Sequence, residues 1–303
     1  MALTGKQFTI KAGKHEVTAV EVGGGLRRYT YDGVDVLAPY GEQELPPSSS
    51  GAVLMPWPNR LRGGQYTFGG RRYQVPITEV PRGNANHGLA RWARWAPVAI
   101  DSAAVTLACD IAPQTGWPFE IRAEVTDALH PEHGLAVTAV ARNHGVTPAP
   151  FGAGFHPYLS VHGHALDEVT VHLPAKQRLV TDEAQLPVGV QEVAKTPYDL
   201  RRAHRLRTLR LDDAFTELST VDGRGAVEVL TRSGGAQLWF DAAFRYLQVY
   251  THEHLDGGAP AVAVEPMTCP ADAFNSGAGL IVLEPGQVWT GTWGIGPRPA
   301  KAR

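Results

Sequence analysis

The chain has little cysteine and no long apolar run, and each shortage excludes a class of protein. Only two of its 303 residues are cysteines, Cys109 and Cys269, which lack metal-type spacing and are too few for a disulfide framework. We expect both to be buried small hydrophobes in a reduced, cytoplasmic compartment. No stretch approaches the roughly 20 apolar residues of a membrane span, and residues 1–9 lack the apolar core of a signal peptide. A soluble protein without a membrane partner is therefore expected.

Excess charge of either sign is also missing. With 28 Lys+Arg against 30 Asp+Glu, the formal net charge is −2, which gives no pull toward nucleic acid or acidic membranes. Hydrophobic residues make up 43% of the chain, enough for a large core rather than disorder. We expect a globular monomer or homodimer that binds no nucleic acid.

Glycine and proline are abundant, and they separate short apolar runs. Residues 119–126 alternate apolar and polar, and residues 135–142 follow after a turn, so the two runs are predicted to be antiparallel neighbours. Residues 196–209, with Pro197 near the start, are predicted to hold one short helix. Further strands are expected at 28–31, 103–109, 169–173, 226–230, 236–240, 246–250, 261–264, 280–283 and 288–295.

This pattern predicts an all-β fold. No linker or block of charge divides the chain, so residues 1–303 are expected to form a single domain, a large antiparallel β-sandwich. Functional side chains would then lie where strands meet loops on one concave sheet face.

Four short polar segments interleaved with aromatic residues carry the candidate chemistry: 56–60, 86–92, 154–158 and 265–275. In the third, His156 follows Gly152 and Gly154 and precedes Pro157-Tyr158. An imidazole has the unperturbed pKa nearest neutral pH, so His156 can lend and regain a proton. The alternative is a histidine whose nitrogens are satisfied by backbone carbonyls in a packed turn.

Glu265 is the candidate base. It ends the apolar run 261–264 and precedes Pro266, where a carboxylate would be partly desolvated. Desolvation raises the pKa of a carboxyl group and makes it a better base. Asp272 and Asn275, just downstream, could orient it by hydrogen bonds. The alternative is a strand-end glutamate that faces water.

The other candidates would bind substrate. Arg60 lies in a loop stiffened by two prolines, where its guanidinium could grip two sugar oxygens or serve as a structural tie. His87 has the same two readings, but Asn86 before it and Trp92 after it give the mix of amide, ring and imidazole that binds hydroxyl-rich ligands. Aromatic faces such as those of Trp92 and Tyr158 stack on a pyranose. Asp212 is a weaker candidate, since adjacent aspartates usually occupy surface turns.

Taken together, these motifs resemble those of the aldose 1-epimerase (galactose mutarotase-like) family, in the family's order. The motifs are residues 59–68, 86–92, 154–158, 265–275 and 283–286. The resemblance implies a large antiparallel β-sandwich that interconverts the α and β anomers of a free sugar without metal or organic cofactor. It assigns the acid to His156, the base to Glu265, the second histidine to His87 and substrate binding to Arg60. The sugar-contacting aspartate falls on Asp212, with Asp213 still open.

An anomer exchange requires an acid and a base acting together. We hypothesise that Glu265 removes the proton of the C1 hydroxyl while a charged His156 protonates the ring oxygen, so that the C1–O5 bond breaks. The open aldehyde then rotates and recloses. Each proton transfer contributes typically ~10²–10⁴-fold.

Other functions stay open at this point. An epimerase acting on a hexose 6-phosphate or a sulfonated sugar would need a basic cluster, which Arg60, Arg62, Arg82, Arg91 and Arg94 could supply. A non-catalytic carbohydrate-binding protein could use the same aromatic and polar face. A glycoside hydrolase is disfavoured, because it requires paired carboxylates and these segments offer one strong carboxylate and a histidine.

Overall fold

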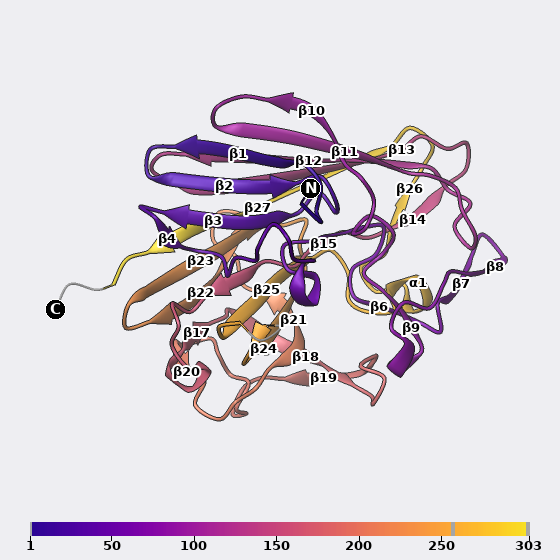
Figure 1. The fold of residues 1–303 in the computed structure, drawn as a ribbon. Helices are drawn as coiled ribbons and strands as arrows, with labels where there is room; N and C mark the ends of the chain where they lie inside the picture. Colours follow the sequence, from indigo (N-terminus) through magenta and orange to yellow (C-terminus); the bar gives the residue numbers. More distant parts are fainter. Residues whose placement is uncertain (1, 256–257, 301–303) are drawn as a thin grey trace.

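Nearly all regular structure in the protein is β-strand. The computed structural model describes residues 2–255 and 258–300, and two large antiparallel sheets dominate them (Figure 1). The nine-stranded sheet has the order β10 (Ala96–Ile100), β11 (Ala104–Ile111), β12 (Ile121–His130), β13 (Gly134–Asn143), β27 (Val288–Arg298), β23 (Gly234–Asp241), β22 (Arg224–Thr231), β17 (Thr170–His172) and β20 (His204–Arg205).

The second large sheet carries most of the candidate chemistry. It has eight strands: β19 (Pro187–Glu192), β18 (Ala175–Thr181), β21 (Asp212–Leu218), β24 (Tyr246–His252), β25 (Ala261–Met267), β15 (Gly154–Phe155) and β5 (Val53–Leu54), with β16 (Tyr158–Ser160) also paired to β25. Figure 1 shows β18, β19, β21 and β24 in the lower part of the molecule and β11–β13 in the upper part.

Smaller elements complete the described fold. A four-stranded sheet contains β1 (Gln7–Ala12), β2 (His15–Val20), β3 (Leu26–Tyr31) and β4 (Val34–Asp35). The strand pairs are β14 (Ala149–Phe151) with β26 (Ile281–Leu283), β6 (Arg60–Arg62) with β9 (Asn84–Asn86), and β7 (Gln65–Phe68) with β8 (Arg71–Gln74). The helical turns are η1 (Pro47–Ser49), η2 (Val80–Arg82), η3 (Leu166–Glu168) and α1 (Ala273–Ser276).

The core lies between the two large sheets. Along β12 the burial of side chains alternates strictly, as expected for a strand with one face in the core. Phe155 of β15 packs against Trp293 of β27, with ring centroids 5.1 Å apart, so aromatic contacts join the two sheets. Burying one large apolar side chain contributes roughly 1.5–3 kcal/mol, and this core contains many of them. The eight-stranded sheet is thereby a fixed platform for polar groups on its other face.

The predicted strand pattern is largely confirmed. β12 and β13 are antiparallel neighbours, in register from Ile121 opposite Asn143 to His130 opposite Gly134. Residues 119 and 120, expected in the first of these strands, lie before its start. Cys109 and Cys269 are both buried free thiols, as predicted. Among the described residues, no helix is long and apolar enough to span a bilayer.

The predicted helix at 196–209 is wrong. This segment consists of turns and the short strand β20. Its internal backbone bonds are short-range turn bonds, such as Asp199 N–H to the Thr196 carbonyl at 3.2 Å. Two other bonds tie it to the residues around β17: Leu173 N–H donates to the Leu200 carbonyl at 2.8 Å, and Leu206 N–H donates to the Val169 carbonyl at 2.8 Å. Long-range pairing has replaced the i to i−4 bonds of a helix.

Candidate active site

A small cavity on the eight-stranded sheet gathers most of the predicted site residues. Its volume is about 240 Å³. The size therefore fits a small ligand rather than a polymer. The cavity is lined by Ser48, Ser49, Asn59, Arg60, Arg82, Asn86, His87, His156, Tyr158, Asp212, Gln248, Tyr250 and Glu265.

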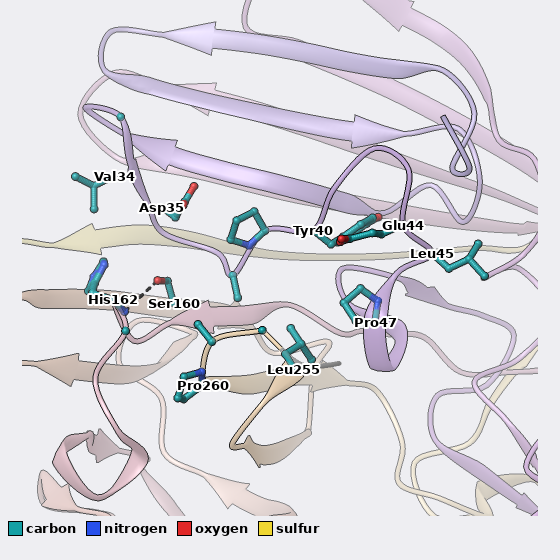
Figure 2. Close-up of a pocket in the computed structure, with 16 residues that line it drawn as sticks. Val34, Asp35, Tyr40, Glu44, Leu45, Pro47, Ser160, His162, Leu255 and Pro260 are labelled. Atoms are coloured by element: carbon teal, nitrogen blue, oxygen red, sulfur yellow. Dashed lines mark hydrogen bonds between the residues drawn. The ribbon is translucent and has the colours of Figure 1, made fainter. Parts of the chain in front are cut away.

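A larger groove, of about 1030 Å³, lies elsewhere on the molecule (Figure 2). Figure 2 shows it lined by the apolar side chains of Val34 and Leu45 together with Asp35, Glu44 and His162. None of the residues predicted from the sequence to act on or bind substrate lines it. The smaller cavity is therefore the candidate active site, since acid and base groups converge there.

Glu265 lies in the middle of the sheet, in β25, whose seven residues are all buried. Its side chain faces the cavity with only 2% of the residue exposed. Burial, and then the charge of Asp212, raise the pKa of this carboxyl group well above its ordinary value. Its Oε2 atom is buried and has no hydrogen-bond partner among residues 2–255 and 258–300. A buried polar atom of this kind is costly unless a ligand satisfies it.

Asp272 and Asn275 do not orient Glu265, contrary to the expectation from sequence. Asp272 Oδ1 instead accepts hydrogen bonds from the Arg62 backbone N–H at 3.0 Å and from the Asn275 side chain at 2.8 Å. These contacts fix the loop that follows β25 to the β6–β7 segment. The carboxylate of Glu265 is positioned by the strand register, in which Gln248 of β24 lies opposite it.

His156 lies between β15 and β16, at a bend that passes very close to another loop. A Cβ atom added at Gly154 would lie 2.7 Å from Pro58 Cβ, so only glycine allows this approach. Backbone bonds hold the bend on both sides, with His156 N–H donating to the Ala52 carbonyl and Gly51 N–H donating to the His156 carbonyl. As a result His156 Nε2 lies 3.3 Å from Glu265 Oε1.

The His156 and Glu265 side chains are both buried and in contact. Burial favours the neutral form of each: it lowers the pKa of His156 to about 3 and raises that of Glu265 well above its usual range. Their 3.3 Å contact acts in the opposite sense, because a proton passed from the carboxyl to the imidazole leaves two attracting charges. We infer that one proton can reside on either group, and the charged His156 hypothesised from the sequence is the form in which the imidazole holds it.

His87 adds a second imidazole with a defined tautomer. Its Nδ1 accepts a hydrogen bond from the Asn59 backbone N–H at 3.2 Å, so the proton of the neutral ring is on Nε2. The ring lies edge-on to that of His156, with centroids 5.4 Å apart. Burial, and then the charges of His156, Arg91 and Arg60, lower its pKa well below the ordinary value. His87 is thus a neutral hydrogen-bond donor beside the acid and base pair.

Arg60 lines the cavity and is also tied to the protein, so it is the structural tie considered from the sequence and lies where it could reach a ligand. Its Nε donates to Glu79 Oε1 and Oε2 at 3.1 and 2.9 Å, and its Nη2 donates to Oε1 at 3.0 Å. Only 13% of the Arg60 side chain and 14% of the Glu79 side chain are exposed. Sequence reasoning did not identify Glu79, because nothing local to residue 79 indicates that β6 lies beside it.

Asp212, and not Asp213, faces the cavity. Successive residues of β21 point to opposite sides, so the two adjacent carboxylates diverge. Asp212 Oδ1 accepts a hydrogen bond from the Gln248 side chain at 2.7 Å, whereas Asp213 pairs with Arg178 at 2.5 Å. Gln248 was missed from the sequence. A polar residue between Leu247 and Val249 in the predicted strand was the available signal.

The two aromatic candidates have different positions. Tyr158 lines the cavity, and its ring stacks on that of His156 with centroids 5.0 Å apart. Trp92 is not among the lining residues and is 50% exposed, in contact with the Arg91 guanidinium 5.6 Å from its ring centroid. The expectation that Trp92 binds substrate is therefore corrected, because its exposed ring does not line the cavity.

Comparisons with known proteins agree with this geometry. The family model described as aldose 1-epimerase matches residues 6–295. The chain is 34% identical to the uncharacterized protein YihR of Escherichia coli (strain K12), over 95% of this chain and 92% of that protein. It is 26% identical to the maltose epimerase of Levilactobacillus brevis, over 75% and 73%. The crystal structure of a GalM/aldose epimerase homologue from C. elegans has a TM-score of 0.86 at 18% identity, covering 98% and 99%.

Proposed function

This chain belongs to the aldose 1-epimerase family and is an isomerase, and on that premise we propose that it interconverts the α and β anomers of a free hexose. One observation carries the proposal. A buried carboxylate with an unpartnered oxygen lies 3.3 Å from a buried imidazole, and both face a cavity with room for one small molecule.

Ring opening in this site uses Glu265 as the base and His156 as the acid. Glu265 removes the proton of the C1 hydroxyl, and the electron pair of that O–H bond forms the aldehyde C=O. The C1–O5 bond breaks at the same time, and O5 takes the proton of the His156 imidazolium. After rotation about C1–C2, the steps run in reverse on the other face of the aldehyde.

Ion pairing favours the protonation state of the pair before ring opening, and burial favours its protonation state after ring opening. Before ring opening the pair is a carboxylate and an imidazolium, which attract each other across 3.3 Å. After ring opening both groups are neutral, the state that burial favours in each. Each of the two protonation states of the pair is therefore stabilised by one effect, the charged state by ion pairing and the neutral state by burial. This suits a reaction that must run in both directions.

The remaining lining groups would hold the sugar. Arg60 Nη1 keeps only a 3.4 Å contact with Asn59 Oδ1, so it can donate to a sugar oxygen. Asp212 can accept from a hydroxyl through its second oxygen, and His87 Nε2–H can donate. The Tyr158 ring provides an apolar surface for the C–H groups. We expect no metal or organic cofactor to take part.

The distribution of arginines supports a neutral sugar. Four of the five arginines considered from the sequence are paired with carboxylates. Glu79 pairs with both Arg60 and Arg82, Arg62 pairs with Asp182 and Asp272, and Arg94 pairs with Glu21. The positive charges considered from the sequence are therefore mostly offset within the protein.

An anionic hexose is the second candidate, and Arg91 favours it. This guanidinium is largely buried, and no ion pair to it is found within the described residues. Its Nη1 donates to the Ser49 hydroxyl at 2.9 Å, and Ser49 lines the cavity. A phosphate or sulfonate group entering beside Ser49 could reach it.

NMR measurement of anomer exchange tests the proposal. Purified protein should accelerate the relaxation of α-glucose or α-galactose, and its rate on hexose 6-phosphates and sulfonated hexoses would rank the two candidates. Sugar binding by calorimetry without any acceleration of exchange would instead identify a non-catalytic carbohydrate-binding protein and refute the proposal.

A further inference from the structure

The Glu79 carboxylate pairs with two arginines that line the cavity, Arg60 and Arg82. It lies at the start of the turn η2, between β8 and β9, and does not itself line the cavity. Besides the three bonds from Arg60, its carboxylate accepts hydrogen bonds from Arg82 Nη1 at 3.0 Å and Asn84 Nδ2 at 3.2 Å. Two backbone bonds between residues 79 and 84 close the turn, so the carboxylate is held rigidly.

Glu79 offsets the positive charge of two arginines that line the cavity, whereas Arg91, beside the cavity-lining Ser49, has no such partner within the described residues. Arg60 and Arg82 line it as two cations, against which Asp212 supplies one negative charge. The His156 and Glu265 pair is neutral in total when it holds one proton. Glu79 supplies the second negative charge, and it does so from behind the guanidiniums. Burial opposes its ionisation, but the hydrogen bonds and charge of Arg60 hold its pKa below the usual value.

We propose that Glu79 is a specificity-determining residue that makes this cavity select an uncharged sugar; the inference rests on the epimerase function proposed above. An anionic substituent approaching Arg60 or Arg82 must compete with a carboxylate that already occupies their donors. A hydroxyl needs only a spare donor, such as Arg60 Nη1, and leaves the ion pairs intact. Glu79 also positions Arg60, since three of the bonds that hold the guanidinium end on it.

The Glu79→Gln variant tests this inference. It keeps the side chain's shape and removes its charge, leaving Arg60 and Arg82 uncompensated. We expect the ratio of kcat/KM for glucose 6-phosphate to that for glucose to rise about tenfold, the effect of one unit charge in a partly buried site. The KM for glucose should rise several-fold with kcat nearly unchanged, because Arg60 loses its positioning.

Glu21→Gln is the matched control. Glu21 is a similarly buried carboxylate, with 18% of its side chain exposed, and it pairs with Arg94 outside the cavity. This variant should leave the ratio unchanged. Adding Arg82→Met to Glu79→Gln should return the ratio toward the wild-type value, because it removes the cation that the first substitution exposed.

The outcomes separate this inference from the proposed function. A folded Glu79→Gln variant with an unchanged ratio overturns the role of Glu79. If that variant does not fold by circular dichroism, Arg82→Met in the native chain should lower the ratio, and an unchanged ratio there also overturns it. If the wild-type protein accelerates no anomer exchange, the proposed function fails. In that case, the ratio of the calorimetric affinities for glucose 6-phosphate and glucose replaces the ratio of kcat/KM as the test of Glu79.

Discussion

Replacing Glu265 with glutamine should have opposite effects on activity and stability. The carboxyl group is 2% exposed, lies 3.3 Å from His156, and has one oxygen without a hydrogen-bond partner in the described residues. Glutamine preserves its volume and can still bond to the imidazole, but it cannot accept the proton of the C1 hydroxyl. The substitution therefore removes the chemistry while it also removes a buried ionisable group.

The expected magnitudes follow from these contacts. Loss of the base should reduce kcat about 10²–10⁴-fold, equivalent to about 2.7–5.5 kcal/mol of transition-state stabilisation. The folded state should become more stable at neutral pH, because the buried amide cannot carry the charge that burial disfavours in the carboxyl group. The direction of this stability change follows from the raised pKa of Glu265. A carboxyl group whose pKa is raised on folding destabilises the folded state as the pH rises toward that raised pKa, and glutamine has no such group.

Two assays check the prediction. Polarimetry of freshly dissolved α-glucose or α-galactose gives the rate, and thermal unfolding followed by circular dichroism gives the stability. Because Glu265 and His156 share one proton, Glu265→Gln combined with His156→Asn should cost little more than the worse single variant. A Glu265→Gln variant with the wild-type rate would refute the assignment of the base. A lower melting temperature would refute the argument from burial.

Three further expectations follow. The pH profile of kcat/KM should rise near pH 3, where His156 loses the second proton of the pair, and fall when Glu265 loses the last one, at a pH well above the ordinary carboxyl range; an acid limb centred at 6.5 would contradict one proton held between the two groups. Asp212→Asn should raise KM about tenfold or more, whereas Asp213→Asn should lower the melting temperature by leaving Arg178 unpaired, and the reverse pattern would show that the two faces of β21 were misassigned. Trp92→Ala should change KM by no more than about twofold in the same polarimetric assay, since its ring lies outside the cavity.

The local sequence pattern was sufficient to predict much of the fold and to indicate the candidate acid and base residues. Alternation of apolar and polar residues located β12 and β13 and indicated that they pair. The residue types in the short polar segments indicated His156 and Glu265 as the acid and base candidates, because few side chains can exchange protons near neutral pH. These features depend on a residue and its immediate neighbours, so they can be read from sequence.

The sequence by itself determined that the chain forms β-strands and carries the candidate acid, base and substrate-binding groups. Only the tertiary structure decided which of these groups meet. The register of β21 against β24 turned Asp212 toward the cavity, and the approach of β6 to the 79–84 turn gave Arg60 its partner Glu79. Long-range pairing likewise replaced the helix expected at 196–209. The physical reason is that strand register and loop contacts are set by packing between segments far apart in the chain, and no local pattern encodes them.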